Sequence, residues 1–286
     1  MIGSGDLMAL SGVAEAIDLL GSAVVAAQPI TALIVPGSSR FALRLWLADG
    51  RVVKLRRPKR PEKAARAWSH VQRLRDPPFP RLLVRTREIL VEEWIDGASL
   101  GRASPAATEL AAAGRLLARL HRTPLGDPAV ARRKAPADLA RATIARLAVL
   151  CERRLLADAV AERLTDAARR YAPAAARIAL THNDLCGENL VIDATGTLRV
   201  IDNETIDVGF VDYDLARTWY RWRLDAAAWA SFVAAYVEAG GAKPVARRLP
   251  FWRIAAVAKS AVVRAAAAPA DLEVALSRLR ELAVPA

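Results

Sequence analysis

Three side chains with complementary chemistry surround a predicted hairpin in the second half of the chain. Asp184 and Asn189 precede the short strand 190–193, and Asp202 directly follows the strand 197–201. Because a tight turn brings the outer ends of two antiparallel strands together, we expect these side chains to meet at one end of the hairpin. An aspartate placed there can accept a hydroxyl proton, and amide and carboxylate oxygens are ligands that Mg²⁺ prefers.

The spacing of these residues resembles a known catalytic pattern. Residues 182–189 have the form H-x-D-x-x-x-x-N, which resembles the catalytic loop of the protein-kinase-like fold. Residues 202–204 have the form D-x-E. That form is similar to the metal motif of aminoglycoside phosphotransferases and choline kinases, whereas protein kinases carry D-F-G.

The resemblance implies a role for each of these side chains. Asp184 would be the catalytic base, and Asn189 and Asp202 would hold Mg²⁺. Glu204 would bind or orient a second metal ion. The cofactors implied are ATP and Mg²⁺.

A third element supports the resemblance. Residues 209–216, G-F-V-D-Y-D-L-A, are similar to the family's G-x-x-x-x-D-L-A segment, whose aspartate, here Asp214, braces the catalytic loop from the start of a helix. An isolated group of acidic residues is most often a solvated surface. Three ordered elements within residues 181–216 are far harder to explain in that way.

The composition sets wider limits. The chain has 286 residues and 53% hydrophobic content, enough for a sizeable core, and its two cysteines and three histidines suggest neither a disulfide framework nor a zinc site. We expect no signal peptide and no membrane span, and therefore a soluble, cytoplasmic protein. The net charge of +12 fits either a solvated basic face or an anionic partner. No nucleic-acid motif accompanies it, and no obligate protein partner is evident.

Short strands are predicted in the first third of the chain. A helix over Val13–Leu20 precedes the strands, which are expected at 32–35, 41–47, 51–55, 82–86 and 89–94. The resemblance implies that the turn containing Gly37, Ser38 and Ser39 covers the nucleotide phosphates with its backbone N–H groups.

Lys54 lies on the third of these strands, where the family's lysine contacts the α- and β-phosphates. Arg56, two residues later on the same strand face, is the alternative. The family's lysine pairs with a glutamate near the middle of the next helix, but Glu62 is the only acid in the predicted helix 62–74 and lies about a turn too early. The sequence leaves open whether Glu62 pairs with Lys54.

A segment resembling the family's hinge follows these strands. Residues 93–100 fit the form E-x-x-x-G-x-x-L, and the resemblance implies that Glu93, Trp94 and Ile95 border the adenine ring. Trp94 could stack on the base or be a buried hinge aromatic.

The remainder of the chain is predicted to be helical. Helices are expected from residue 106 to His121 and at 137–156, 156–171, 225–239 and 249–267. His121 and Cys186 are expected to be structural. Arg217 and Arg221 share one helix face, where they either pair with acidic loops or point toward the acceptor.

These observations predict an α+β protein with the bilobal protein-kinase-like fold. Residues 1–95 would form a small antiparallel-sheet lobe that binds nucleotide, and residues 96–286 a mostly helical catalytic and acceptor lobe. The expected activity is ATP- and Mg²⁺-dependent phosphoryl transfer to a hydroxyl of a small molecule: a sugar, sugar acid, amino alcohol or aminoglycoside-like compound. The alternative is a non-catalytic, nucleotide-binding relative.

Overall fold

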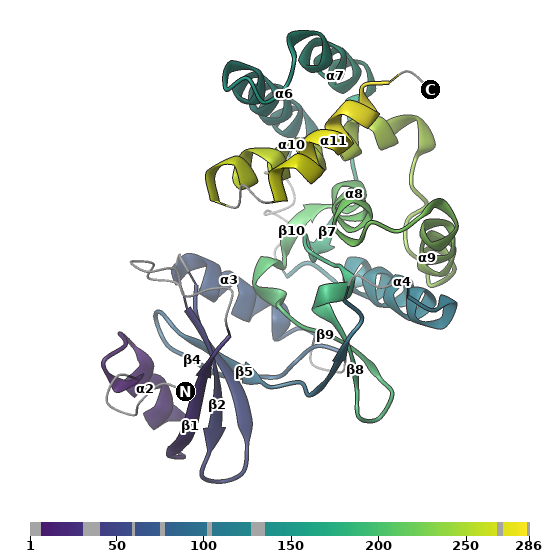
Figure 1. Ribbon diagram of the computed structural model, residues 1–286. Coiled ribbons are helices and arrows are strands. Elements are labelled where there is room, and N and C mark those ends of the chain that lie inside the picture. The colour runs from purple at the N-terminus through teal and green to yellow at the C-terminus, as the bar shows by residue number, and fades with distance from the viewer. Residues whose placement is uncertain are drawn as a thin grey trace. The chain divides into compact units, whose positions relative to one another are not determined.

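A computed structural model of the chain describes residues 7–30, 41–58, 61–74, 78–101, 105–126, 135–267 and 271–284. The chain divides into two compact units, shown in Figure 1. The first comprises Met1–Ala103 with Gly187–Asp207, and the second comprises Ser104–Cys186 with Val208–Ala286. The packing of residues 187–207 with the first unit was not anticipated. The functional boundary expected after residue 95 stays a prediction.

The first unit is built on a five-stranded antiparallel sheet in the order β1-β2-β3-β5-β4. The strands are β1 (Val24–Pro29), β2 (Phe41–Leu47), β3 (Val52–Arg57), β4 (Leu82–Arg85) and β5 (Leu90–Glu93). The β2–β3 hairpin turns at Asp49-Gly50, where Gly50 has a φ of 85°. Glycine is favoured in this left-handed conformation because glycine has no Cβ.

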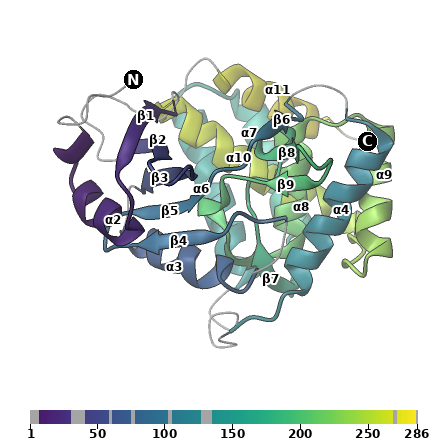
Figure 2. The same cartoon turned by 90° about the horizontal axis from the view of Figure 1, so that it is seen from below.

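An apolar core lies on one face of this sheet. Helix α2 (Val13–Leu20) buries Val13, Ala16, Ile17 and Leu20 in one cluster with strand residues such as Leu43 and Leu55. Helix α3 (Pro61–Val71) begins at a proline, which suits a first helical turn. Figures 1 and 2 show both helices beside the sheet.

A three-stranded sheet completes the first unit. Its order is β6-β8-β9, formed by β6 (Gly97–Ser99), β8 (Leu190–Asp193) and β9 (Leu198–Val200). The short helices η1 (Gly187–Asn189) and η2 (Asn203–Thr205) flank the hairpin. A Cβ on Gly97 would lie 2.2 Å from the carbonyl oxygen of Ile192, so only glycine allows β6 to approach β8 this closely.

The second unit is mostly helical. Its helices are α4 (Ala107–Arg122), α6 (Pro136–Glu152), α7 (Asp158–Tyr171), α8 (Val211–Trp222), α9 (Ala226–Glu238), η3 (Ala246–Arg248), α10 (Leu249–Ala267) and α11 (Leu272–Leu282). Helix α10 contacts α6, α7, α8 and α11. Its residues Phe251, Ile254 and Val257 are fully buried, so α10 forms the centre of this core.

Two short strands and a helix pair complete the second unit. Strands β7 (Ile178–Thr181) and β10 (Asp207–Phe210) form a two-stranded sheet. Helices α4 and α9 lie side by side in both Figure 1 and Figure 2. No helix in the described part of the chain is both long enough and apolar enough to cross a membrane.

The α+β class predicted from the sequence is confirmed, with an antiparallel-sheet N-terminal region and a mostly helical remainder. The expected helix at Val13–Leu20 and the hairpin at 190–201 are present. The expected strand 32–35 lies outside the described residues.

The contact between α4 and α9 generates a stability prediction. A Cβ on Gly114 would lie 2.5 Å from the Phe232 carbonyl oxygen and 3.0 Å from the Tyr236 nitrogen. In an open helix, replacing glycine by alanine stabilises by about 1 kcal/mol. Here we expect Gly114→Ala to lower the free energy of unfolding by about 1–3 kcal/mol, because two backbones must separate. Denaturant unfolding measures this, and a rise in stability would contradict the close packing.

Candidate functional site

The predicted site residues are divided between the two units, and each unit holds its own part. Asp184 and Asp214 belong to the second unit. Lys54, Asn189 and Asp202 belong to the first. Gly37, Ser38 and Ser39 lie outside the described residues.

In the second unit, the loop that carries Asp184 is held by one buried carboxylate. Asp214, on α8, accepts hydrogen bonds from the backbone N–H of His182 at 2.8 Å and of Asn183 at 2.6 Å. Asn183 has a φ of 64°, a left-handed conformation that is uncommon outside glycine. The bracing role expected for Asp214 is therefore confirmed, because its two oxygens fix the backbone immediately before Asp184.

The approach of β10 to β7 sets the position of Asp214. A Cβ on Gly209 would lie 2.6 Å from the Thr181 Oγ1, so a larger residue would push the strands apart. The backbone N–H of Val211 then donates to the Arg177 carbonyl at 3.0 Å, and α8 begins there. Gly209 thus allows the close approach of the two strands, and this approach places Asp214 at the start of α8 beside the loop.

His121 completes this buried network. Its Nε2 lies 3.0 Å from the Asp214 Oδ2, and its Nδ1 lies 2.8 Å from the Tyr236 hydroxyl. The expected structural role agrees with these contacts. Burial alone would raise the pKa of Asp214, but the hydrogen bond from His121, the charges of His121 and His182, and the His182 N–H outweigh it, so the pKa of this carboxyl lies below its usual value.

Asp184 is contacted by two arginines of α8. The Arg217 Nη2 donates to the Asp184 Oδ1 at 3.2 Å, and the Arg221 Nε lies 2.9 Å from the same oxygen. Arg217 is further held by the Asn183 carbonyl at 3.0 Å and by the Ser260 Oγ at 2.6 Å. The Asp184 side chain keeps 22% of its surface exposed, so it stays accessible to a ligand.

In the first unit, Lys54 has two carboxylates near its ammonium group. Its Nζ lies 3.4 Å from the Glu92 Oε1 and 3.6 Å from the Asp202 Oδ1. Glu92 is opposite Lys54 in the β3–β5 register, and its side chain is 2% exposed. Glu62 is exposed. The glutamate beside Lys54 is therefore Glu92 of β5 and not Glu62 of α3.

Glu92 and Arg56 extend the contacts of Lys54 into a buried charged cluster. The Arg56 guanidinium lies 3.7 Å from Glu92 and 3.2 Å from Glu204, and its side chain is only 3% exposed. Burying a guanidinium is costly unless it is paired. Glu204, expected near a metal ion, thus also serves as a partner of Arg56.

Asn189 and Asp202 lie at the same end of the β8–β9 hairpin. The backbone N–H of Ile201 donates to the Asn189 carbonyl at 2.8 Å, continuing the register in which Leu190 faces Val200. Asp202 has a φ of 59°, and such a strained residue is often found at functional sites. No group of three or more His, Cys, Asp or Glu side chains in the described ranges could hold a metal ion.

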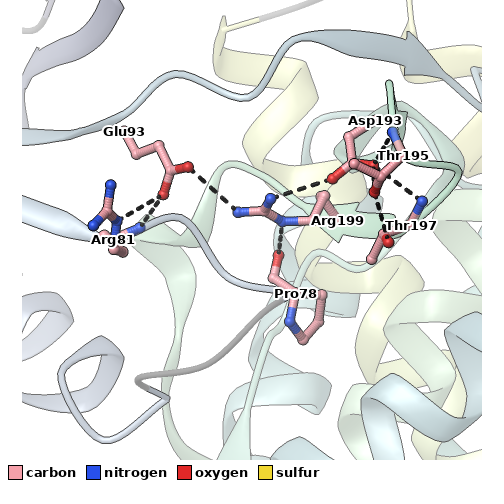
Figure 3. A network of polar contacts seen from close by, with 7 residues as sticks. All are labelled: Pro78, Arg81, Glu93, Asp193, Thr195, Thr197 and Arg199. Atoms are coloured by element: carbon pink, nitrogen blue, oxygen red, sulfur yellow. Dashed lines mark hydrogen bonds and ion pairs between the residues drawn. The ribbon is translucent and has the colours of Figure 1, made fainter. Parts of the chain in front are cut away.

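Polar contacts hold the end of β5, where Glu93 lies (Figure 3). Glu93 accepts from the Arg81 backbone at 3.2 Å, and its other carboxylate oxygen lies 3.8 Å from Arg199. Arg199 in turn donates to the Pro78 carbonyl at 3.3 Å. The N–H groups of Glu93 and Trp94 donate to the carbonyls of Arg81 and Val52. The backbone N–H groups of Glu93 and Trp94 therefore already have hydrogen-bond acceptors within the first unit.

Trp94 also takes part in a cluster with Arg44. The Arg44 guanidinium lies 4.7 Å from the Trp46 ring centroid and 4.4 Å from that of Trp94. Both Arg44 and the Trp94 Nε1 contact the Asp96 Oδ1, at 3.1 and 2.8 Å. Such cation–π contacts hold the indole of Trp94 at the sheet.

One feature of this arrangement was not anticipated from the sequence. Glu92 was treated only as part of a strand, although an acid within a buried strand opposite a lysine signals an ion pair. For Arg217 and Arg221, the sequence left open whether they pair with acidic loops or point toward the acceptor, and the structure shows the pairing, because both guanidinium groups contact Asp184.

Comparison with known proteins identifies a family and a shared fold. The sequence model described as the phosphotransferase enzyme family matches residues 33–252. No curated protein sequence gives a significant match.

Several solved structures share the fold. A macrolide 2'-phosphotransferase from Brachybacterium faecium has a TM-score of 0.63 and 18% identity, covering 96% of this chain and 98% of that one. A choline kinase from Streptococcus pneumoniae has a TM-score of 0.68 and 15% identity, covering 91% and 92%. A spectinomycin phosphotransferase, in complex with ADP and spectinomycin, has a TM-score of 0.64 and 13% identity, covering 94% and 97%.

The Asp214 network predicts an acid-dependent loss of stability. In Asp214→Asn, the amide cannot accept both backbone N–H groups or balance His121, so we expect a loss of about 3–5 kcal/mol near pH 7. Because the folded-state pKa is depressed, this stabilisation is present above the unfolded pKa of about 3.9 and is lost as the pH falls through the folded pKa.

Denaturant unfolding of both proteins from pH 7 to pH 2.5 measures this difference. The gap between wild type and Asp214→Asn should narrow below about pH 4. A gap of constant size would contradict the charged, hydrogen-bonded state of Asp214.

Proposed function

Because the chain belongs to the phosphotransferase enzyme family, we propose that it transfers the γ-phosphoryl group of ATP to a hydroxyl of a small molecule. The observation that carries this proposal is the contact of Lys54 with Asp202 at 3.6 Å. An ammonium suited to phosphate and a carboxylate suited to a divalent cation thereby form one group.

Lys54 would bind the nucleotide phosphates, with Glu92 fixing the position of its ammonium. Asn189 and Asp202 would hold Mg²⁺, which neutralises phosphate charge when bound. Mg²⁺ usually takes one or two carboxylates besides phosphate oxygens and water, so two protein ligands suffice. The 36% exposure of the Asp202 side chain suits such a partly hydrated ion. Glu204 stays a candidate ligand through an oxygen not used by Arg56.

Asp184 would position the acceptor hydroxyl and accept its proton. The acceptor oxygen forms a bond to the γ-phosphorus while the bond from this phosphorus to the β–γ bridging oxygen breaks, which yields ADP and a phosphomonoester. Asp214 supports this step by fixing the loop backbone. His121 and Cys186 need no part in proton transfer.

Glu93, Trp94 and Ile95 are proposed to border the adenine ring. Since the N–H groups of Glu93 and Trp94 already donate to the sheet, recognition of the base edge would use Ile95 or carbonyl oxygens. Gly37, Ser38 and Ser39 keep their proposed role over the phosphates. A cytoplasmic location suits a protein that consumes ATP.

The non-catalytic alternative loses its main support. It depended on the missing glutamate partner of Lys54, and Glu92 provides a carboxylate 3.4 Å from the Lys54 ammonium. A small-molecule kinase is therefore the function that the site favours.

The base and the metal ligand can be separated experimentally. Asp184→Asn keeps the shape of the side chain but cannot take a proton, so we expect kcat to fall by roughly 10²-fold or more while MgATP binding is unchanged. Asp202→Asn should lose the Mg²⁺-dependent part of ATP binding as well as turnover.

Calorimetric titration of ATP with and without Mg²⁺, together with ADP release on a panel of hydroxylated metabolites, measures both effects. A wild-type protein that binds no MgATP and turns over no acceptor would overturn the proposed function. If Asp184→Asn kept full turnover, Asp184 would not be the base.

The new partner of Lys54 gives a second prediction. Glu92→Gln removes the charge that holds Lys54, so we expect the KM for ATP to rise roughly tenfold, as typical for one charged hydrogen bond. Glu62→Gln is the matched control because Glu62 is exposed, and it should leave the KM unchanged. Adenosine binding, which involves no phosphate, should be unaffected in both variants. A larger effect of Glu62→Gln than of Glu92→Gln would contradict this assignment.

A further inference from the structure

The charge around Asp184 is unusual for a site that receives a cationic acceptor. Two guanidinium groups, Arg217 and Arg221, lie within 3.2 Å of one oxygen of this carboxylate. One negative charge therefore faces two positive charges. An ammonium group brought to this point would meet repulsion from both arginines, whereas an anionic group would be attracted.

The two arginines are held differently by the contacts described above. Arg217 binds the Asn183 carbonyl, the Ser260 hydroxyl and Asp184, and so ties the loop to α10. Arg221, one turn later on the same face of α8, reaches Asp184 through Nε and keeps 23% of its side chain exposed. A guanidinium carries five N–H donors in a planar fork that matches carboxylate and phosphate oxygens.

Two buried polar groups lie beside this part of α8. Tyr213 precedes Arg217 by four residues, and its buried hydroxyl has no hydrogen-bond partner among the described residues; the same holds for the Arg146 Nη1 on α6. Burial raises the pKa of the Tyr213 hydroxyl, against the opposing charges of Arg217 and Arg146. The hydroxyl therefore stays protonated, with the positive charges of Arg217 and Arg146 and the negative charge of Asp214 around it.

The acidic groups of α8 do not offset these cations. The carboxylate of Asp214 is bound by the backbone of His182 and Asn183 and by His121. Burial raises the pKa of Asp212, opposed by the charges of Arg177, Arg248 and His121, so its charged neighbours are different from those of Asp184. At the Asp184 carboxylate itself, the guanidinium groups of Arg217 and Arg221 outnumber the single negative charge.

We infer that the acceptor carries an anionic group, a carboxylate or a phosphate, close to the hydroxyl that is phosphorylated, and that Arg221 binds this group. The inference rests on the proposed transfer at Asp184. Asp184 takes the hydroxyl proton and Arg221 takes the neighbouring anion, which orients the hydroxyl oxygen toward the phosphorus. Arg217 positions the loop and is not itself the specificity residue.

Matched acceptor pairs test this assignment. Glycerate is compared with glycerol, gluconate with glucose, and serine with ethanolamine, each with saturating MgATP. We expect kcat/KM to be at least tenfold higher for the member that carries the additional carboxylate, in line with one charge-assisted hydrogen bond.

Variants of Arg221 locate the preference. Arg221→Gln should raise the KM for anionic acceptors roughly 10- to 100-fold, change the KM for the matched members without the carboxylate much less, and leave the affinity for MgATP unchanged. Arg221→Lys should restore part of the preference, because it keeps the charge but not the fork. Arg170→Gln, on the exposed face of α7, is the control and should change neither constant.

The outcomes separate the inference from the proposed function. Efficient transfer to neutral or cationic members, with the anionic members inert, overturns the inference and leaves phosphotransfer standing. An equal effect of Arg221→Gln on both members of a pair overturns it too, as does a protein that binds MgATP and phosphorylates no member. Loss of MgATP binding in the wild type would remove the proposed function as well.

Discussion

The side chain of Asp214 is fully buried, and its carboxylate contacts two backbone N–H groups and the imidazole of His121. Such a carboxylate is stable only while every one of these partners is present, because a buried charge without them is very costly. The partners therefore fix the beginning of α8 against the loop after β7. Asn183 can hold its left-handed conformation because the structure on both sides determines it, and the direction of Asp184 follows from that conformation.

The charged groups of each unit are balanced in a different way. In the first unit, Lys54 and Arg56 face Glu92, Asp202 and Glu204, so negative charge prevails and a cation would be attracted. In the second unit, Asp184 faces Arg217 and Arg221, so positive charge prevails and an anion would restore balance. The strongly basic composition alone could not locate these charges, since net charge says nothing about the lining of a site.

The sequence predicted the parts whose signal is local. The β8–β9 hairpin with Asn189 and Asp202 at one end follows from a turn between two short apolar runs. The bracing by Asp214 was implied by the resemblance of residues 209–216 to the family's G-x-x-x-x-D-L-A segment. Strands β6 and β7 were missed although β8 and β9 are equally short, because neither β6 nor β7 is joined by a tight turn to a second apolar run that would indicate a hairpin. The pairing of β6 with β8 depends on a close approach at Gly97, which joins segments far apart in the chain. The Lys54–Glu92 pair was missed for a related reason, since it requires knowing which strand lies beside β3.

The location of Glu92 has a consequence for how the phosphate lysine is held. In protein kinases the glutamate partner lies on a helix, and the position of that helix controls whether the ion pair forms. Here Lys54 and Glu92 face each other on neighbouring antiparallel strands, whose backbones are kept about 5 Å apart by the sheet hydrogen bonds. The spacing of the pair is therefore set by the sheet itself, and Arg56 on the same face of β3 neutralises the second oxygen of Glu92. A shift of α3 would leave the pair intact, so the lysine is positioned whenever the sheet is folded.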